Sequence, residues 1–295
     1  LPENYGLSFS VRCKRSRIHH GGAVEERVRN AIAAAMGQEA NSDEYEAVLV
    51  VVRINRNMCT ISIDTSGELL HRRGYRQEVV KAPLRETLAA GALACTGWNS
   101  EVALLDPMCG SGTLAIEGAM IAAKIPPGLK RRFSFMARPD FDSSLWSRVK
   151  EEAEAQIRVP PVSVLASDRD AGAVAAAREN AKRAGVDGFV DFRCASVSEV
   201  EAPSETGLLI SNPPYGHRIG AKKKLRDLYA AVGNIVRAKL HGWNVALITN
   251  DKALASHTKL NLKSGSPYLP HGGLKVQVFV RWQGGQDPRL KSTGK

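Results

Sequence analysis

A short apolar run followed by a glycine-rich loop and an apolar helix constrains the fold of this chain more than any other feature. Residues 102–105 are expected to form a buried strand, residues 106–113 the loop, and residues 114–123 the helix. This order is typical of a Rossmann-type nucleotide-binding unit, in which glycines let the backbone pass close to a ligand. Further apolar runs alternate with helical patterns, which predicts an α/β fold with a doubly wound sheet.

The loop departs from the dinucleotide-binding pattern at two positions. Ala115 occupies the place of the third glycine, and Asp106 closes the preceding strand. A carboxylate at this point repels a pyrophosphate but attracts an ammonium group, and S-adenosyl-L-methionine carries such a group. We therefore expect this cofactor to be bound by loop residues Asp106, Met108, Cys109, Gly110, Ser111, Gly112 and Thr113.

A second loop follows the apolar run 208–211 and consists of Asn212, Pro213, Pro214 and Tyr215. In open α/β sheets, ligands bind outside the carboxyl ends of the strands. The two prolines remove two backbone donors, so the Asn212 side-chain oxygen and the Pro213 carbonyl can accept both N–H groups of one exocyclic amine. Tyr215 offers a ring on which a heterocycle can stack. Asn212, Pro213 and Tyr215 are therefore candidate catalytic residues, and a simple strand-ending turn is the alternative.

Three further runs accompany the two loops: LHRRGYR at residues 70–76, APLRE at 82–86 and YGHRIG at 215–220. Together these motifs resemble the THUMP-containing guanine-N2 RNA methyltransferases, over residues 9–282. Within that family, the bacterial enzymes acting on large-subunit ribosomal RNA are the most similar. The resemblance implies a class I methyltransferase fold with a mostly parallel seven-stranded sheet. It also implies that Pro83 packs beside the cofactor and Asn212 lies next to it, although a helix cap explains Pro83 equally well.

The activity implied by this resemblance is methylation of the N2 amine of a guanosine in large-subunit ribosomal RNA, with S-adenosyl-L-methionine as the donor. Transfer RNA is an alternative substrate. Methyltransferases of adenine N6 or of glutamine amides share the second loop, and a catalytically idle RNA-binding module is an alternative of a different class. Carbon-methylating RNA enzymes are disfavoured because no cysteine follows the second loop.

The predicted domain organisation has four parts. Residues 1–65 resemble a partial THUMP RNA-binding domain, residues 66–83 form a linker, residues 84–283 form the methyltransferase domain, and residues 284–295 are expected to be disordered. The opening strands of a THUMP domain and the ferredoxin-like segment usual in the family are missing. The chain begins with Leu1 rather than Met, which indicates a fragment or a processed form.

Asp168 and Ser196 are the remaining candidate cofactor ligands. Asp168 follows the apolar run 162–166, and an acidic residue at such a strand end suits the two hydroxyls of a ribose; an N-cap for a helix over residues 171–184 is the alternative. Related enzymes carry an aspartate near Ser196 that meets the adenine amino group. This chain has no aspartate there, so the contact is either made by the hydroxyl or lost.

The charge balance favours a polyanionic partner. Lysine and arginine number 41 against 30 acidic residues, which gives a net charge of +11 and a pI near 9.6. Nucleic acid is the commonest partner of such proteins, although a solubilising surface is the alternative. The expected RNA-binding residues are Arg12, Lys14, Arg15 and Arg17 near the start of the chain, and Arg218, Lys222, Lys223 and Lys224 beside the second loop.

The insertion 125–160 contains the aromatic residues Phe133, Phe135, Phe141 and Trp146 among basic residues. Such a pattern can contact phosphates and stack on bases. Aromatic residues in an insertion more often pack it onto the body of the protein, so both interpretations stay open.

The five cysteines and the hydropathy pattern exclude several classes of protein. The cysteines lack C-x-x-C spacing, which indicates neither a zinc site nor a disulfide framework. We therefore expect no metal and a reducing, cytoplasmic location. No apolar run approaches the ~18 residues of a membrane span, and the chain does not open with a signal-peptide pattern. We expect a monomer that does not bind membranes.

Overall fold

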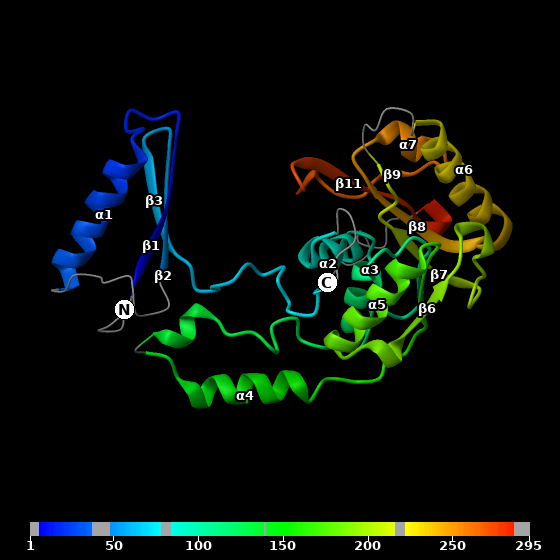
Figure 1. The fold of residues 1–295 in the computed structure, drawn as a ribbon, viewed down its shortest axis with the longest axis horizontal. Helices are drawn as coiled ribbons and strands as arrows, with labels where there is room; N and C mark the ends of the chain where they lie inside the picture. The colour runs from blue at the N-terminus through cyan, green and yellow to red at the C-terminus, as the bar shows by residue number, and fades with distance from the viewer. Residues whose placement is uncertain (1–5, 37–47, 78–83, 139, 216–221, 286–295) are drawn as a thin grey trace. The chain divides into compact units, whose positions relative to one another are not determined.

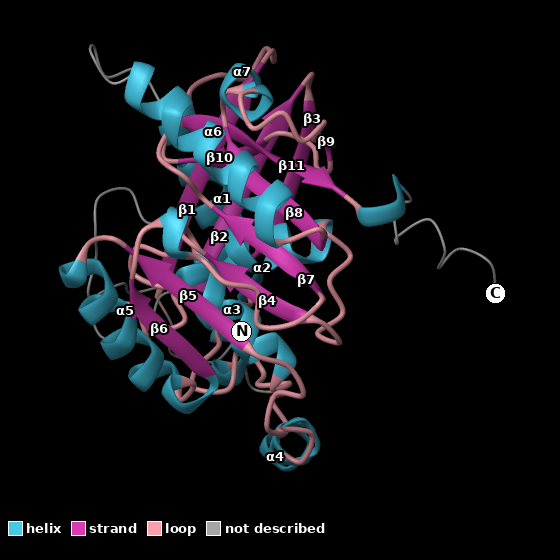
Figure 2. Cartoon of the chain, turned by 90° about the vertical axis from the view of Figure 1, so that its right-hand side faces the viewer, coloured by secondary structure: helices cyan, strands magenta, loops and turns pink. Residues whose placement is uncertain are grey.

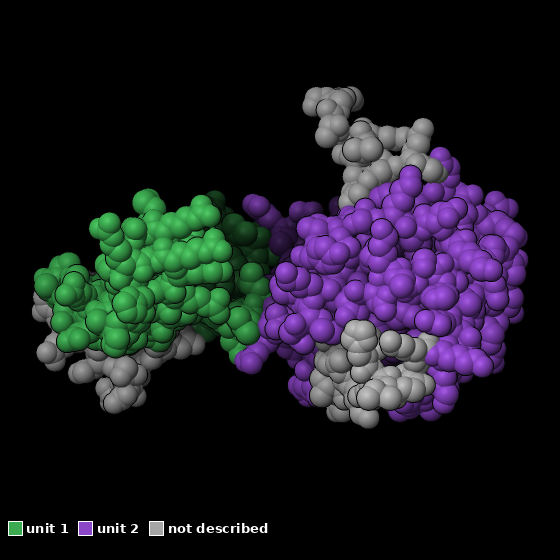
Figure 3. All heavy atoms as spheres, turned by 90° about the horizontal axis from the view of Figure 1, so that it is seen from above, with its two compact units in different colours: residues 1–70, 131–150 green, residues 71–130, 151–295 purple. Residues whose placement is uncertain are grey.

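The computed structural model describes residues 6–36, 48–77, 84–138, 140–215 and 222–285 (Figure 1). The chain divides into two compact units (Figure 3). The first unit comprises residues 1–70 and 131–150, and the second comprises residues 71–130 and 151–295.

The first unit is built on a three-stranded sheet with one helix on it. The strands are β1 (Leu7–Lys14), β2 (Val48–Asn55) and β3 (Met58–Ile63), and the helix is α1 (Gly21–Met36). β2 lies between β1, which is parallel to it, and β3, which is antiparallel. Alternate β2 residues are buried because successive side chains point to opposite faces. Leu7, Val24, Val48, Val50, Val52 and Ile54 form the buried core of this unit.

The aromatic residues of the insertion pack against one another. Phe133 and Phe135 stack at 5.3 Å between ring centroids, and Trp146 of α4 (Ser143–Glu154) meets Phe135 edge-on at 5.2 Å. Phe141 lies 5.9 Å from Phe135. Phe135 lies in the short helix η1 (Ser134–Ala137), which begins directly after Phe133. The four rings therefore pack against one another, and stacking of these residues on RNA bases stays a prediction.

A mixed sheet of eight strands forms the second unit (Figure 2). Its order is β10-β11-β8-β7-β4-β5-β6, with β9 paired to β11. The strands from β8 to β6 are parallel, whereas β11 is antiparallel to β8, β9 and β10. The bounds are β4 (Ala103–Asp106), β5 (Val164–Asp168), β6 (Val190–Cys194), β7 (Thr206–Ser211), β8 (Gly242–Thr249), β9 (Lys263–Ser264), β10 (Leu269–His271) and β11 (Leu274–Arg281).

This sheet confirms the expected α/β fold and differs from the expected seven strands by the addition of β9. β9 has only two residues, and so short a strand leaves no alternating pattern in a sequence.

Helices cover both faces of the sheet. The helices are α2 (Glu86–Cys95), α3 (Thr113–Ala122), α5 (Ala171–Ala184), α6 (Lys222–Lys239) and α7 (Lys252–Ser256), with short 3₁₀ turns η2 (Asp187–Phe189), η3 (Val197–Glu199) and η4 (Gln283–Gly285). Leu104 shares a core with buried residues of α2, α3 and α5. Its neighbour Leu105 shares a separate core with α6 and α7. Since consecutive strand residues point to opposite faces, the two cores lie on opposite sides of the sheet.

No helix within the described ranges is both long and apolar enough to cross a membrane.

Candidate active site

The first loop begins at Asp106, the last residue of β4, which is only 1% exposed. Its Oδ1 accepts a hydrogen bond from the Ser211 hydroxyl at 2.7 Å and one from the Met108 backbone N–H at 3.3 Å. Burial is the main cause that raises the pKa of Asp106 to about 7. The carboxyl therefore links the start of the first loop to the end of β7. Contact with an ammonium group of the cofactor stays a prediction for this residue.

The glycine loop is bonded to the neighbouring strand β5. Cys109 donates its N–H to the Ser167 carbonyl at 2.9 Å, and Gly110 donates its N–H to Asp168 Oδ2 at 3.0 Å. The other Asp168 oxygen accepts the Asp170 N–H at 3.0 Å. The N-cap of α5 is Asp170, whose side chain accepts two N–H groups of the first turn, so the N-cap interpretation of Asp168 is wrong. Asp168 lies beside the cofactor loop, and its contact with a ribose stays a prediction.

Gly112 lets the loop approach α5 closely. Its φ of +85° lies in the left-handed region, and a Cβ at this position would come within 2.9 Å of the Ala177 Cβ. Cys109 is buried beneath the same loop, and burial raises the pKa of its thiol well above the ordinary value. The thiol therefore stays protonated and fills space. Ser111 and Thr113 are also buried, whereas Met108 is half-buried.

The second loop carries a buried acceptor that nothing in the described part of the chain satisfies. Asn212 is half-buried, and its Oδ1 has no hydrogen-bond partner there. Leaving such an atom unpaired costs on the order of 1–3 kcal/mol, so a polar ligand that donates a hydrogen bond to it would be stabilised. Pro213 is buried and Pro214 exposed. Tyr215 packs against both cores, and burial raises its pKa to about 12, so it stays neutral.

The two loops leave the same edge of the sheet from adjacent strands. β4 and β7 are parallel neighbours in which Leu105 pairs with Leu209, and neighbouring strands lie roughly 4.8 Å apart. The hydrogen bond between Ser211 and Asp106 joins the two loops where they begin. The structure therefore brings Asp106, Asp168 and Asn212 to one edge of the sheet, the carboxyl edge, as the sequence predicted.

Further buried polar atoms lie near the carboxyl ends of other strands and were missed by sequence reasoning. Within the described residues, Ser167 Oγ on β5, Asn250 Oδ1 just after β8 and His271 Nδ1 on β10 have no hydrogen-bond partner. Burial lowers the pKa of His271. With Asn212, these atoms mark a polar edge that fits a polar ligand. The run Thr249-Asn250 closes a buried strand, and this signal could have identified Asn250.

Ser196 is already engaged in local hydrogen bonds. Its hydroxyl bonds Glu199 Oε2 and Ser198 Oγ, each at 2.7 Å, and it forms a capping box at η3 with Glu199. The adenine contact predicted for Ser196 would have to share this hydroxyl. Glu199 supplies a carboxylate three positions after Ser196.

Several predicted residues lie outside the described ranges. Pro83 and Arg218 are among them, and the side chain of Lys222 is not described either. Lys223 and Lys224 are exposed in the first turn of α6. Among the described residues, no three or more His, Cys, Asp or Glu side chains lie close enough together to hold a metal ion.

The basic cluster of the first unit is exposed and contains one residue more than the sequence predicted. Arg12, Lys14, Arg15 and Arg17 are all exposed. Arg53 of β2 lies directly opposite Arg12 of β1 and is also exposed. Arg53 belongs to this cluster because of the register between β1 and β2. A local run of charges in the sequence does not reveal this register.

The doubly wound sheet, with a glycine loop after β4 and an Asn-Pro-Pro-Tyr loop after β7, defines a class I S-adenosylmethionine-dependent methyltransferase. The chain belongs to the family of RMKL-like methyltransferase domains, which it matches over residues 73–267.

Proteins with similar sequences and structures carry related names. Ribosomal RNA large subunit methyltransferase K/L of Syntrophotalea carbinolica is 39% identical over 292 residues, which cover 92% of this chain and 40% of that protein. A provisionally named RNA methyltransferase of Synechocystis is 35% identical over 280 residues. The matched residues make up 92% of this chain and 73% of that protein. The crystal structure of SMU.472, which is provisionally described as a methyltransferase, was solved in complex with SAH. It superposes on this chain with a TM-score of 0.82 at 29% identity, and the superposition covers 97% of this chain and 76% of the SMU.472 chain. The chain thus spans less than half the length of the K/L relative.

Proposed function

We propose that this chain transfers a methyl group from S-adenosylmethionine to the exocyclic N2 amine of a guanosine in large-subunit ribosomal RNA. The observation that carries the proposal is the buried Oδ1 of Asn212 beside the cofactor loop, which has no hydrogen-bond partner among the residues that the structure describes. An acceptor in that position suits an amine and does not suit a carbonyl or a phosphate. The names of the K/L relatives support ribosomal RNA as the substrate.

S-adenosylmethionine supplies an activated methyl group when it is bound. The chain contributes residues that hold it: Asp168 for the ribose, and the loop of Gly110 and Gly112 where the backbone must pass close to the ligand. The carboxyl ends of β4 and β5 bring these groups together. The chemistry of this donor set therefore fits the cofactor.

The chain's own contribution to the reaction is to orient the amine. The lone pair of a guanine amine is shared with the ring, so the amine is a poor nucleophile. Hydrogen bonds to Asn212 Oδ1 and to the Pro213 carbonyl would hold the N–H groups and leave the lone pair directed at the methyl group. Orientation of this kind can contribute about 7–11 kcal/mol in favourable cases. Tyr215 would support the base by stacking.

A covalent nucleophile is not needed for this reaction. Cys109 is the cysteine of the cofactor loop, and burial raises the pKa of its thiol. A thiol in that state is a weak nucleophile. This supports amine methylation over carbon methylation.

We propose that RNA is held by the basic residues of both units. In the first unit, which we interpret as a partial THUMP domain, the exposed cluster of Arg12, Lys14, Arg15, Arg17 and Arg53 would neutralise phosphates. In the second unit, Lys223 and Lys224 follow the second loop in sequence and would contact phosphates near the target nucleotide.

The experiment that tests the proposal identifies the product directly. The protein is incubated with labelled cofactor and with separated ribosomal and transfer RNAs, and the nucleosides are analysed by mass spectrometry. N2-methylguanosine in large-subunit RNA is the expected product. The same nucleoside in transfer RNA alone would move the substrate to that class, and N6-methyladenosine would overturn the assigned base. RNA binding without any transfer would identify an idle binding module.

A further inference from the structure

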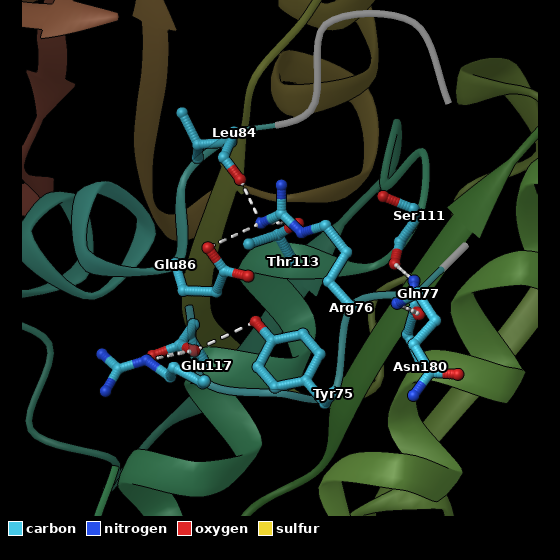
Figure 4. Close-up of polar contacts among 10 residues, drawn as sticks. Tyr75, Arg76, Gln77, Leu84, Glu86, Ser111, Thr113, Glu117 and Asn180 are labelled. Atoms are coloured by element: carbon cyan, nitrogen blue, oxygen red, sulfur yellow. Dashed lines mark hydrogen bonds and ion pairs between the residues drawn. The ribbon is translucent and has the colours of Figure 1, made fainter. Parts of the chain in front are cut away.

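The segment 73–77 is bonded into the methyltransferase unit by buried polar side chains (Figure 4). Arg73 Nε lies 2.9 Å from Glu117 Oε1, and the Tyr75 hydroxyl donates to the same oxygen at 3.0 Å. Glu117 belongs to α3 and is 2% exposed. None of the residues proposed to orient the amine or to hold the cofactor lies in this segment, so its dense bonding to the helix that follows the cofactor loop calls for another reason.

Arg76 connects the segment to the beginnings of two helices. Its Nη2 donates to the Thr113 hydroxyl at 3.2 Å, and Thr113 is the first residue of α3. The same nitrogen pairs with Glu86 Oε2 of α2 at 3.2 Å and donates to the Leu84 carbonyl. One guanidinium therefore holds the last residue of the cofactor loop against α2.

Asn180 of α5 makes a second connection and is fully buried. Its Oδ1 accepts the Gln77 backbone N–H at 3.3 Å and an Arg183 N–H at 2.7 Å. Its Nδ2 donates to the Ser111 carbonyl at 3.1 Å. A single side-chain amide thus joins the backbone of segment 73–77 to the backbone of the cofactor loop, as Figure 4 shows.

The bond to Ser111 fixes one peptide unit of the loop from both sides. The Gly112 N–H of this peptide donates to the Cys109 carbonyl at 2.8 Å, and the carbonyl of the same peptide accepts from Asn180. Because a peptide unit is planar, these two bonds determine its orientation. Segment 73–77 and the shape of the loop are therefore held by the same side chain.

We propose that Asn180 and Arg76 are positioning residues for the cofactor, which hold loop 109–113 in its binding shape and couple it to the order of segment 73–77. The inference depends on the cofactor of this class and is independent of the RNA base that is methylated. Coupling of this kind is reciprocal: cofactor binding is expected to order the segment, and loosening the segment is expected to weaken cofactor binding.

The test uses the full chain and the variant Asn180→Asp, which keeps the acceptor for Gln77 and removes the donor to Ser111. The Arg183 guanidinium, which bonds the same side-chain oxygen at 2.7 Å, favours the charged form of the introduced carboxylate, and that form has no proton to donate to Ser111. Asn234→Ala is the matched control, since Asn234 is exposed on α6 and accepts from Arg237. Calorimetry with S-adenosylhomocysteine measures affinity, and hydrogen exchange measures the order of loop 109–113 without the ligand.

We expect Asn180→Asp to weaken S-adenosylhomocysteine binding by about tenfold or more, as the loss of a buried hydrogen bond predicts, and to speed exchange in the loop. The control should bind normally. In the wild-type chain, the ligand should slow exchange in segment 73–77, and this protection should shrink in Asn180→Asp.

A second variant, Arg76→Lys, keeps the positive charge near Glu86 but replaces the planar guanidinium with a shorter, more strongly hydrated ammonium, which is expected to lose the bonds to Thr113 and Leu84. The variant should therefore raise the KM for the cofactor more than it lowers kcat. Folded Asn180→Asp protein with affinity within twofold of wild type and unchanged loop exchange would overturn the proposal. The proposal would also be overturned if S-adenosylhomocysteine left the rate of hydrogen exchange in segment 73–77 of the wild-type chain unchanged.

Discussion

Ser211 donates its hydroxyl to Asp106 across 2.7 Å and thereby joins the ends of two adjacent parallel strands. Asp106 is buried, and burial is the main cause that raises its pKa to about 7. The hydrogen bonds from Ser211 and Met108 oppose this rise because they stabilise the charged form. The two loops of the active site therefore start from a carboxyl that titrates near neutral pH.

This titration predicts how stability depends on pH. The pKa of Asp106 is about 7 in the folded chain against the usual 3.8, so the folded state binds more protons between these values. Stability contributed by the protonated carboxyl is present below pH 4 and is lost as pH rises to 7, by up to about 1.4 kcal/mol per pH unit. Asp106→Asn should lack this loss, so its stability relative to wild type should increase from pH 5 to pH 7.5.

Urea unfolding at several pH values measures this difference. Asp227→Asn, which changes an exposed carboxyl of α6, is the control and should follow the wild-type profile. Glu117 also has a pKa raised to about 7, and it contributes equally to wild type and variant, so it cancels in the comparison. Parallel profiles for wild type and Asp106→Asn would contradict the placement of this carboxyl.

Asn212→Ala removes the acceptor proposed to orient the amine. We expect kcat to fall by at least about 100-fold, since misplacement of a reacting group has effects of this size. RNA affinity should stay nearly unchanged because Asn212 carries no charge for phosphates. Single-turnover methylation with fluorescence anisotropy for binding separates the two effects. Undiminished turnover would refute the role of Asn212, and the exposed Asn234→Ala serves as the control.

The fold could be predicted from the sequence because its signals are local. The helix expected over residues 171–184 has those bounds in the structure, since the Asp170 cap and Gly185 mark its ends. The loops after β4 and β7 were also predictable, because each follows a short apolar run. In a parallel sheet, the ends of such runs meet at one edge.

Contacts between residues far apart in sequence could not be predicted. Arg53 joins the basic cluster through its register with Arg12, and Asn180 reaches Ser111 across 69 positions. The assignment of the α5 cap to Asp170 instead of Asp168 depended on side-chain direction, which two aspartates in the same short run do not reveal.

Lys223 and Lys224 provide a test of RNA contacts in the second unit. Replacing both with glutamine should weaken RNA binding and lower the slope of log K against log salt by about one per lost phosphate contact. Lys182→Gln, which changes an exposed lysine in the last turn of α5, is the control of matched chemistry. Filter binding over a range of salt concentrations gives the slopes. An unchanged slope in the double variant would contradict the proposed contact.

Arg53→Gln tests whether the basic cluster of the first unit is functional. Arg53 lies directly opposite Arg12 on adjacent strands, and like charges in this arrangement destabilise a sheet. The change should therefore raise the melting temperature slightly while weakening RNA binding and flattening its salt dependence. Arg193→Gln is the control, since Arg193 is exposed but paired with Asp191 at 2.6 Å. If the cluster is only a solvated face, Arg53→Gln will gain stability with no loss of RNA affinity, and the proposed RNA contact is wrong.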